Sequence, residues 1–368
     1  MFEVSGREMR VSGSADKSAQ GKSRLVWVDY AKVLGIYLVV FGHLPLQDSG
    51  LNQYLSTFRM PLFFMLSGYF ESNGSMRKTA ATGLKRLLWP YAVFYVLAYA
   101  WTLIETFWLH IPYYPNPTSY EVLVKPLFGF ILGIGDNTQY STIINGPLWF
   151  LMALFWVKFL FSLLSTLSKG KPLFIYMAQI VVVAAAWLLK DCEYALWFSI
   201  ECALLAMPFY VMGYCLKSYD LIERLQRSGK MAFGIPIAFV LSLLIFKVNG
   251  GISIANGVYG KSILLCYLDG ACGSLMLILL TRSLPQRRVS LIEAIAQGTL
   301  VIVGLHLHLA YGIVDILESA LNASAIAFSD LEGLAFALLI TAALILPIKA
   351  IEKKCPWVLG RFKRKSAR

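Results

Sequence analysis

Long blocks of apolar residues, separated by short polar joints, dominate the pattern along the chain. Each block is close to the roughly 20 residues that a helix needs to cross the hydrocarbon core of a membrane. We predict about ten such segments: 26–45, 54–71, 87–110, 147–168, 173–190, 194–216, 231–247, 260–281, 290–312 and 331–352. Helices are expected because lipid offers no water to an unpaired backbone group. A membrane barrel would instead show weakly alternating segments of about 10 residues.

Composition supports an all-α, polytopic membrane protein rather than a soluble globule. Of the 368 residues, 58% are hydrophobic and only 15% are charged, against roughly 25% charged in an average soluble domain. A soluble domain of this length could not bury so much apolar surface, whereas lipid solvates the outer faces of membrane helices.

Positive charges gather in the terminal segments and in alternate loops between the predicted helices, and this bias predicts how the chain is oriented in the membrane. If the N-terminus is cytoplasmic, the inner segments hold 25 of the 33 lysines and arginines. These segments are 1–25, 72–86, 169–172, 217–230, 282–289 and 353–368. Such a bias places both termini in the cytoplasm. It also accounts for the net charge of +12, and the scatter over six segments argues against a nucleic-acid binder.

The chain is expected to form one domain. We predict a polar cytoplasmic segment (1–25), a single transmembrane domain (26–352) and a basic cytoplasmic tail (353–368), with no cleavable signal peptide. Within the outer loop 111–146, the apolar stretch 120–134 is either a re-entrant or interfacial helix or a plain connector. The six cysteines form no CxxC pair, so we interpret them as packing residues and expect no metal site.

Three ionisable residues share one face of the first predicted helix. Asp29 and Lys32 are neighbours across one turn, and Lys32 to His43 returns to within about 20° of the same direction. The rise between Lys32 and His43 is about 16 Å. Polar side chains at membrane depth usually serve function. The alternative is a charged pair that reaches the inner rim, with a hydrogen-bonded histidine at the outer rim.

Other ionisable residues lie inside predicted helices. They are Glu105, Lys158, Glu201, Asp269, His306 and His308. His306 and His308 point about 200° apart, so at most one of them is expected to face the core. We expect Lys158 to form a buried ion pair with Glu105 or Glu201 that joins two helices.

Six motifs occur in order along the chain. They are VDYAKVLGIYLVVFGHLP (28–45), FRMPLFFMLSGYF (58–70), KRLLWPY (85–91), GPLWFLMALF (146–155), MPFYVMGYCL (207–216) and GTLVIVGLHLHL (298–309). Together they resemble the acyltransferase-3 family of membrane-bound sugar O-acyltransferases, with the closest likeness to the branch related to fucose 4-O-acetylases. The resemblance covers about residues 24 to 350, and we expect a stand-alone transferase without the esterase-like extension of some members.

The resemblance implies transfer of an acetyl or similar acyl group from cytoplasmic acetyl-CoA, the donor, to a sugar hydroxyl. The family pattern of a basic residue, ten residues and a histidine fits Lys32 and His43, so the catalytic role falls on His43, with Asp29 holding Lys32. The expected acceptor is a cell-envelope glycan or a lipid-linked sugar, in the inner membrane of a bacterium. No permanently bound cofactor is expected.

The same resemblance implies binding residues. The basic cluster after the second helix, expected to hold the acyl-CoA, falls on Arg77, Lys78, Lys85 and Arg86. Two arginines three apart, common in the family, are absent there. The expected substrate-binding residues are Arg59, Ser67, Tyr69, Trp149 and His306. Ser67–Tyr69 is expected to be a turn. The alternative function is a transporter or flippase of a lipid-linked saccharide, although neither repeats nor paired broken helices are visible.

Overall fold

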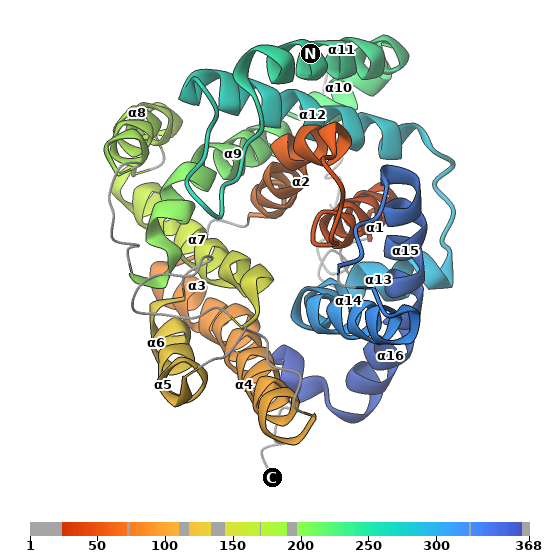
Figure 1. Cartoon of the computed structure of the whole chain (residues 1–368). Helices are drawn as coiled ribbons and strands as arrows, with labels where there is room; N and C mark the ends of the chain where they lie inside the picture. Colours follow the sequence, from red (N-terminus) through yellow and green to blue (C-terminus); the bar gives the residue numbers. More distant parts are fainter. Residues whose placement is uncertain are drawn as a thin grey trace, which may run out of the picture.

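The computed structural model describes residues 24–71, 74–109, 118–133, 144–169, 171–189, 197–323 and 325–362, and this part of the chain is helical, with no β-strand. Figure 1 shows the helices arranged around α1, α2 and α14. The longer helices are α1 (Val26–Phe41), α2 (Gly50–Tyr69), α4 (Trp89–Ile104), α7 (Trp149–Leu167), α8 (Pro172–Leu188), α9 (Ile200–Ser218), α11 (Met231–Asn249), α12 (Ile263–Ser283), α14 (Thr299–Leu321) and α15 (Asp330–Ala343). The shorter ones are α3 (Met76–Gly83), α5 (Ser119–Leu123), α6 (Lys125–Leu132), α10 (Leu221–Arg227), α13 (Ser290–Gln297) and α16 (Ile345–Lys354).

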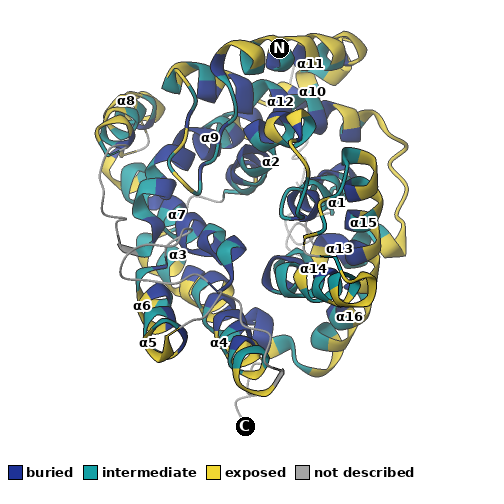
Figure 2. Cartoon of the chain, in the orientation of Figure 1, coloured by how far each residue is buried: buried dark blue, intermediate teal, exposed yellow. Residues whose placement is uncertain are grey.

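The protein is a multi-pass membrane protein. In the described residues, 7 helical segments are long and apolar enough to cross a membrane: Met76–Trp108, Gly146–Leu167, Ile200–Ser218, Met231–Asn249, Ile263–Ser283, Thr299–Leu321 and Asp330–Lys354. Large apolar side chains are exposed on the outer helices, and Figure 2 shows this exposed surface on α11, α15 and α16 around a buried centre. Each block predicted from the sequence overlaps a helix, while the count of ten crossings and the cytoplasmic termini remain predictions.

Several predicted boundaries are wrong. The helix expected over 26–45 ends at Phe41, so His43 lies just beyond α1 rather than inside it. The segment expected at 290–312 is broken at Gly298 into α13 and α14, and α14 continues to Leu321. A Cβ at Gly298 would lie 2.5 Å from the side chain of Ile348, so α16 packs directly on this break. The expected loop 72–86 is helical from Met76, and this helix continues through a π-helical stretch (Leu84–Leu88) into α4. Gly83 lies in this continuous helix, and its lack of a side chain leaves room for the ring of Phe155 to pack against the backbone.

Glycines let α2 and α9 approach each other at the centre of the bundle. A Cβ at Gly68 would overlap with the backbone carbonyl of Tyr210, and one at Gly213 would overlap with that of Met65. Small residues that bring backbones together are the usual means of packing helices in lipid, where no hydrophobic effect drives their association. α2 also packs on α12 and α1, so it is enclosed on several sides.

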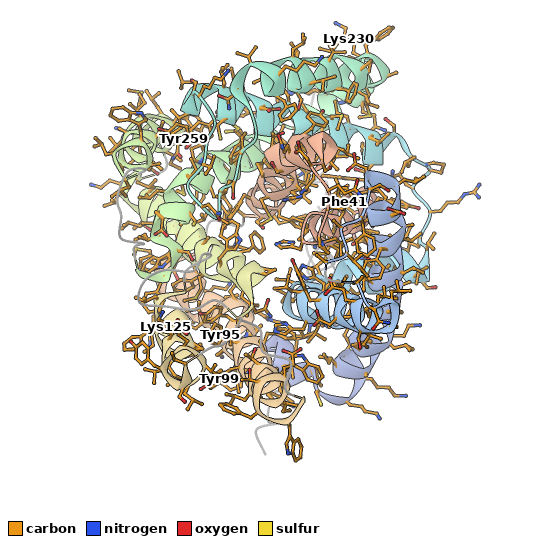
Figure 3. The ribbon with its side chains drawn as sticks, viewed as in Figure 1. Phe41, Tyr95, Tyr99, Lys125, Lys230 and Tyr259 are labelled. Carbon is orange, nitrogen blue, oxygen red and sulfur yellow. The ribbon has the colours of Figure 1, made fainter. Side chains whose placement is uncertain are left out.

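Three tyrosines on α4 hold the short helices α5 and α6 against it. The hydroxyls of Tyr91, Tyr95 and Tyr99 donate to the carbonyls of Phe130, Pro126 and Leu123, at 2.7, 2.6 and 2.9 Å. Figure 3 shows Tyr95 and Tyr99 on α4 close to Lys125 at the start of α6. The apolar stretch 120–134 is therefore a pair of short helices packed on α4, rather than one continuous helix. Whether it enters the membrane remains a prediction.

Candidate active site

Two histidines from distant parts of the chain meet where α1 ends. The rings of His43 and His306 have centroids 5.0 Å apart and cross at 71°. In each ring Nδ1 lies 2.7 Å from the carbonyl oxygen four residues earlier, Val39 for His43 and Ile302 for His306. A carbonyl only accepts, so Nδ1 carries the hydrogen in both rings, and in the neutral form each Nε2 keeps its lone pair. His306 is 0% exposed, and its Nε2 has no partner among the described residues.

A guanidinium group lies beside this histidine pair. Arg59 on α2 packs against Gly42, where a Cβ would overlap with its Nη1. Nη1 also donates to Oδ1 of Asn52, at 2.6 Å. The positive charge interacts electrostatically with His43. The site therefore combines a nitrogen lone pair with a fixed cation that could stabilise a developing negative charge.

A small cavity adjoins His43. Its volume is about 50 Å³, and its wall is formed by α1, α2, α14 and the start of α7. Trp149 and Phe150 line it, together with Met60 and Phe63. Trp149 therefore lines the same cavity as His43, and its role in binding substrate stays a prediction. A space of this size holds one or two waters.

Asp29 and Lys32 lie at the other end of α1 and do not pair with each other. Asp29 forms an ion pair with Nε of Arg24 at 2.5 Å, and not with Lys32, the partner that the sequence analysis expected. Lys32 is partly buried and makes no hydrogen bond or ion pair within the described part of the chain. α1 ends at Phe41, about 14 Å of helical rise from Lys32, and His43 follows beyond that end.

Ser67 and Tyr69 belong to the last turn of α2, so the expected SGY turn is helical. The Tyr69 hydroxyl donates to Glu223 at 3.0 Å, and its ring packs edge-on against Trp27, 5.3 Å between centroids. Trp27 lies near the start of α1, about 21 Å of helical rise from Phe41, where α1 ends just before His43. Tyr69 is therefore remote from the histidine pair and shapes the opposite end of the bundle.

The four basic residues expected to bind the donor lie together in the chain on one helical stretch. Arg77 and Lys78 are on α3, and Lys85 and Arg86 are in the π-helical segment that follows. All four are exposed, and none of them forms an ion pair with another described residue. They are therefore free to meet an anionic ligand.

Lys158 forms the expected ion pair but with a different partner. Its Nζ lies 3.2 Å from Oε2 of Glu71 and 3.1 Å from the hydroxyl of Tyr210, which itself bonds to Glu71. The predicted partners Glu105 and Glu201 were wrong. Sequence reasoning missed Glu71 because it sits at the last position of a predicted helix, where a charge is easily attributed to the loop.

Two polar residues near the site were also missed. Asn52 precedes Arg59 by seven residues, a spacing that puts both on one helix face, so this signal could have been found. Asn145 donates from Nδ2 to the carbonyl of Gly304 at 2.8 Å and so joins the start of α7 to α14. No pattern in the local sequence predicts this contact. In the described residues, no cluster of three or more potential metal ligands occurs.

Comparison with known families defines the class of this protein. The chain matches the family model of an acyltransferase domain over residues 25–349 and belongs to this family, acyltransferase-3. It is therefore a membrane acyltransferase, in agreement with the motifs and with the fold. No curated protein and no solved structure matches the chain.

Proposed function

We propose that this protein is an O-acyltransferase of the bacterial inner membrane that moves an acetyl or similar acyl group from cytoplasmic acyl-CoA to a hydroxyl of a cell-envelope sugar or lipid-linked glycan. The observation that carries the proposal is the pairing of His43 with His306 beside Arg59. In His43 the Nδ1 hydrogen is held by Val39, which fixes the ring and leaves Nε2 as a base. A sugar hydroxyl needs such a base because it is a poor nucleophile at neutral pH.

The reaction follows from this geometry. Nε2 of His43 takes the proton of the acceptor hydroxyl while its oxygen attacks the thioester carbonyl carbon. The carbon–sulfur bond then breaks, the ester forms, and the thiolate of CoA receives the proton back from His43. The guanidinium of Arg59 stabilises the oxyanion between these steps. His306, whose Nε2 has no partner within the part of the chain that the structure describes, hydrogen-bonds the sugar acceptor.

The donor reaches His43 from the end of the bundle that carries the basic residues. Arg77, Lys78, Lys85 and Arg86 bind the phosphates of the donor, since charge-assisted hydrogen bonds to phosphate are strong. The unpaired Lys32 lies on the route along α1. The cavity at His43 is too small for a thioester. Its aromatic lining, Phe63 and Phe150, must therefore move when the donor binds.

The first test compares wild type with His43→Ala in a strain that lacks the gene, at matched membrane abundance. Base-labile acyl groups on envelope glycans are measured by mass spectrometry. Wild type should add an acetyl increment, and His43→Ala should lower it by about 100-fold or more, the size of a lost general base. Leu241→Ala, at an exposed position of α11, serves as the control for expression and should match wild type.

Each other result has a definite meaning. Acylation that survives in His43→Ala would remove His43 from the chemistry. If wild type adds no acyl group and a saccharide precursor collects on one membrane face without the gene, the protein is a flippase instead.

A further inference from the structure

A second and larger cavity lies on the side of α14 that faces away from His43. Its volume is about 900 Å³, within the range of about 300–1,000 Å³ typical of ligand sites. It runs between α4 and α14, with Leu344 and Pro347 of the α15–α16 region also in its wall. Leu97 and Ile316 on its walls are 50% and 67% exposed, so the cavity is a groove that opens sideways, toward lipid.

α14 separates this groove from the histidine pair. Thr299, Leu300 and Val303 face the small cavity at His43, whereas Leu305 and Leu309 line the groove. The two sites thus share one stretch of one helix. A molecule in the groove lies next to Gly304 and Leu305, which directly precede His306 in the chain.

Four polar side chains interrupt the apolar lining: Glu105, His308, Asp315 and Ser319. Glu105 of the π-helical segment Glu105–Leu109 accepts a hydrogen bond from Nε1 of Trp101 at 2.5 Å, and it interacts electrostatically with Asp315. Within the described residues no donor bonds to Asp315. The Nε2 atom of His308 is buried without a partner there. Such groups are costly at membrane depth unless a ligand satisfies them.

The lining selects the chemistry of the occupant. Apolar walls open to the bilayer suit hydrocarbon chains. Two carboxylates accept hydrogen bonds from hydroxyl groups but repel phosphate, so an ordinary anionic phospholipid or a diphosphate-linked sugar fits poorly. A lipid whose sugar is joined to its anchor without phosphate supplies both the chains and the hydroxyls.

We propose that the groove between α4 and α14 binds an uncharged glycolipid, with its hydrocarbon chains on the apolar wall and its sugar hydroxyls on Glu105, Asp315 and His308, on the other side of α14 from His43. This inference goes beyond the proposed function, because it assigns a second binding site and a class of lipid that has no phosphate between sugar and anchor.

Gly312 offers a way to fill the groove. It lines the wall on α14, and a Cβ there would meet no atom within 4 Å. A phenylalanine at this position projects into open space, so the fold should tolerate it while the groove is blocked. Leu241→Phe, on an exposed face of α11, adds the same ring elsewhere and is the matched control.

The experiment uses the full-length protein in lipid nanodiscs with a monoglucosyl diacylglycerol that carries a photoreactive diazirine in one acyl chain. Phosphatidylglycerol with the same chain is the comparison. After irradiation, labelled peptides are identified by mass spectrometry. The glucolipid should label α4 and α14 at least about fivefold more than phosphatidylglycerol does, a preference of the size expected from about one kcal/mol at the head group.

The variants decide between the readings. Gly312→Phe should abolish labelling in the groove, Leu241→Phe should leave it unchanged, and the double variant Glu105→Gln/Asp315→Asn should remove the preference between the two lipids. Equal labelling by both lipids in wild type, or no labelling of α4 and α14, would overturn the proposal. Because labelling needs no acyl donor, the same labelling should be seen with His43→Ala. The assignment of the groove would hold even if no acyl transfer were found.

Discussion

At the scale of the residue, the absence of a side chain at position 42 determines where Arg59 can lie. The guanidinium occupies the space that any Cβ at Gly42 would need, directly beside His43. The backbone of Gly42 is in the right-handed helical region, which every residue adopts. The requirement for glycine is therefore one of space and not of backbone conformation.

This gives a sharp prediction. Gly42→Ala should displace Arg59 from His43 and lower kcat/KM by about 10- to 100-fold, less than the full loss of an oxyanion donor. Gly50→Ala is the control, since a Cβ at Gly50 meets nothing within 4 Å. Acyl transfer by the purified proteins is the measurement. If Gly42→Ala is as active as Gly50→Ala, Arg59 has no part in the reaction.

Two histidines illustrate how far residue-level reasoning reaches. The angle of about 200° between His306 and His308 requires that they face different surroundings, and they do. His306 meets His43, while His308 lines the groove. The sequence could not say which of them faces the core, because that depends on how α14 is rotated against its neighbours.

At the scale of the element, one ionic cluster joins three helices. Lys158 comes from α7, Tyr210 from α9, and Glu71 follows the end of α2. The Glu71 side chain is 7% exposed and that of Lys158 is 30% exposed. Removing one partner from such a pair leaves a charge that is partly cut off from water, whereas removing both does not.

Glu71→Gln should therefore destabilise the protein by about 1–3 kcal/mol, below the cost of a fully buried pair because Lys158 is partly solvated. The midpoint of thermal unfolding in detergent measures it. The double variant Glu71→Gln/Lys158→Met should regain most of the loss. Asp220→Asn, which breaks an exposed pair with Lys217, should change nothing. A double variant less stable than Glu71→Gln alone would contradict this account.

At the scale of the whole molecule, the orientation in the membrane is still a prediction from charge. The segment with Arg227 is expected in the cytoplasm, and Asn322, after the end of α14, is expected outside. Both residues are exposed, so a thiol at either would be accessible to a reagent on its own side.

We expect a membrane-impermeant maleimide to label Asn322→Cys in right-side-out spheroplasts and to label Arg227→Cys only after permeabilisation. The background is a variant with the six native cysteines replaced by serine. Labelling is read by a mass shift on a gel. The reverse pattern would invert the topology and with it the route proposed for the donor.

The sequence by itself determined the class of this protein and singled out His43 as the candidate catalytic residue. Apolar blocks of spanning length must become helices in lipid, and the motif that contains Lys32 and His43 lies within one short stretch of the chain. Tertiary structure alone decided the partners: His306 and Arg59 for His43, Arg24 for Asp29, and Glu71 for Lys158. The physical reason is that periodicity fixes the direction of a side chain about its own helix axis, whereas the neighbour that it meets depends on how separate helices pack.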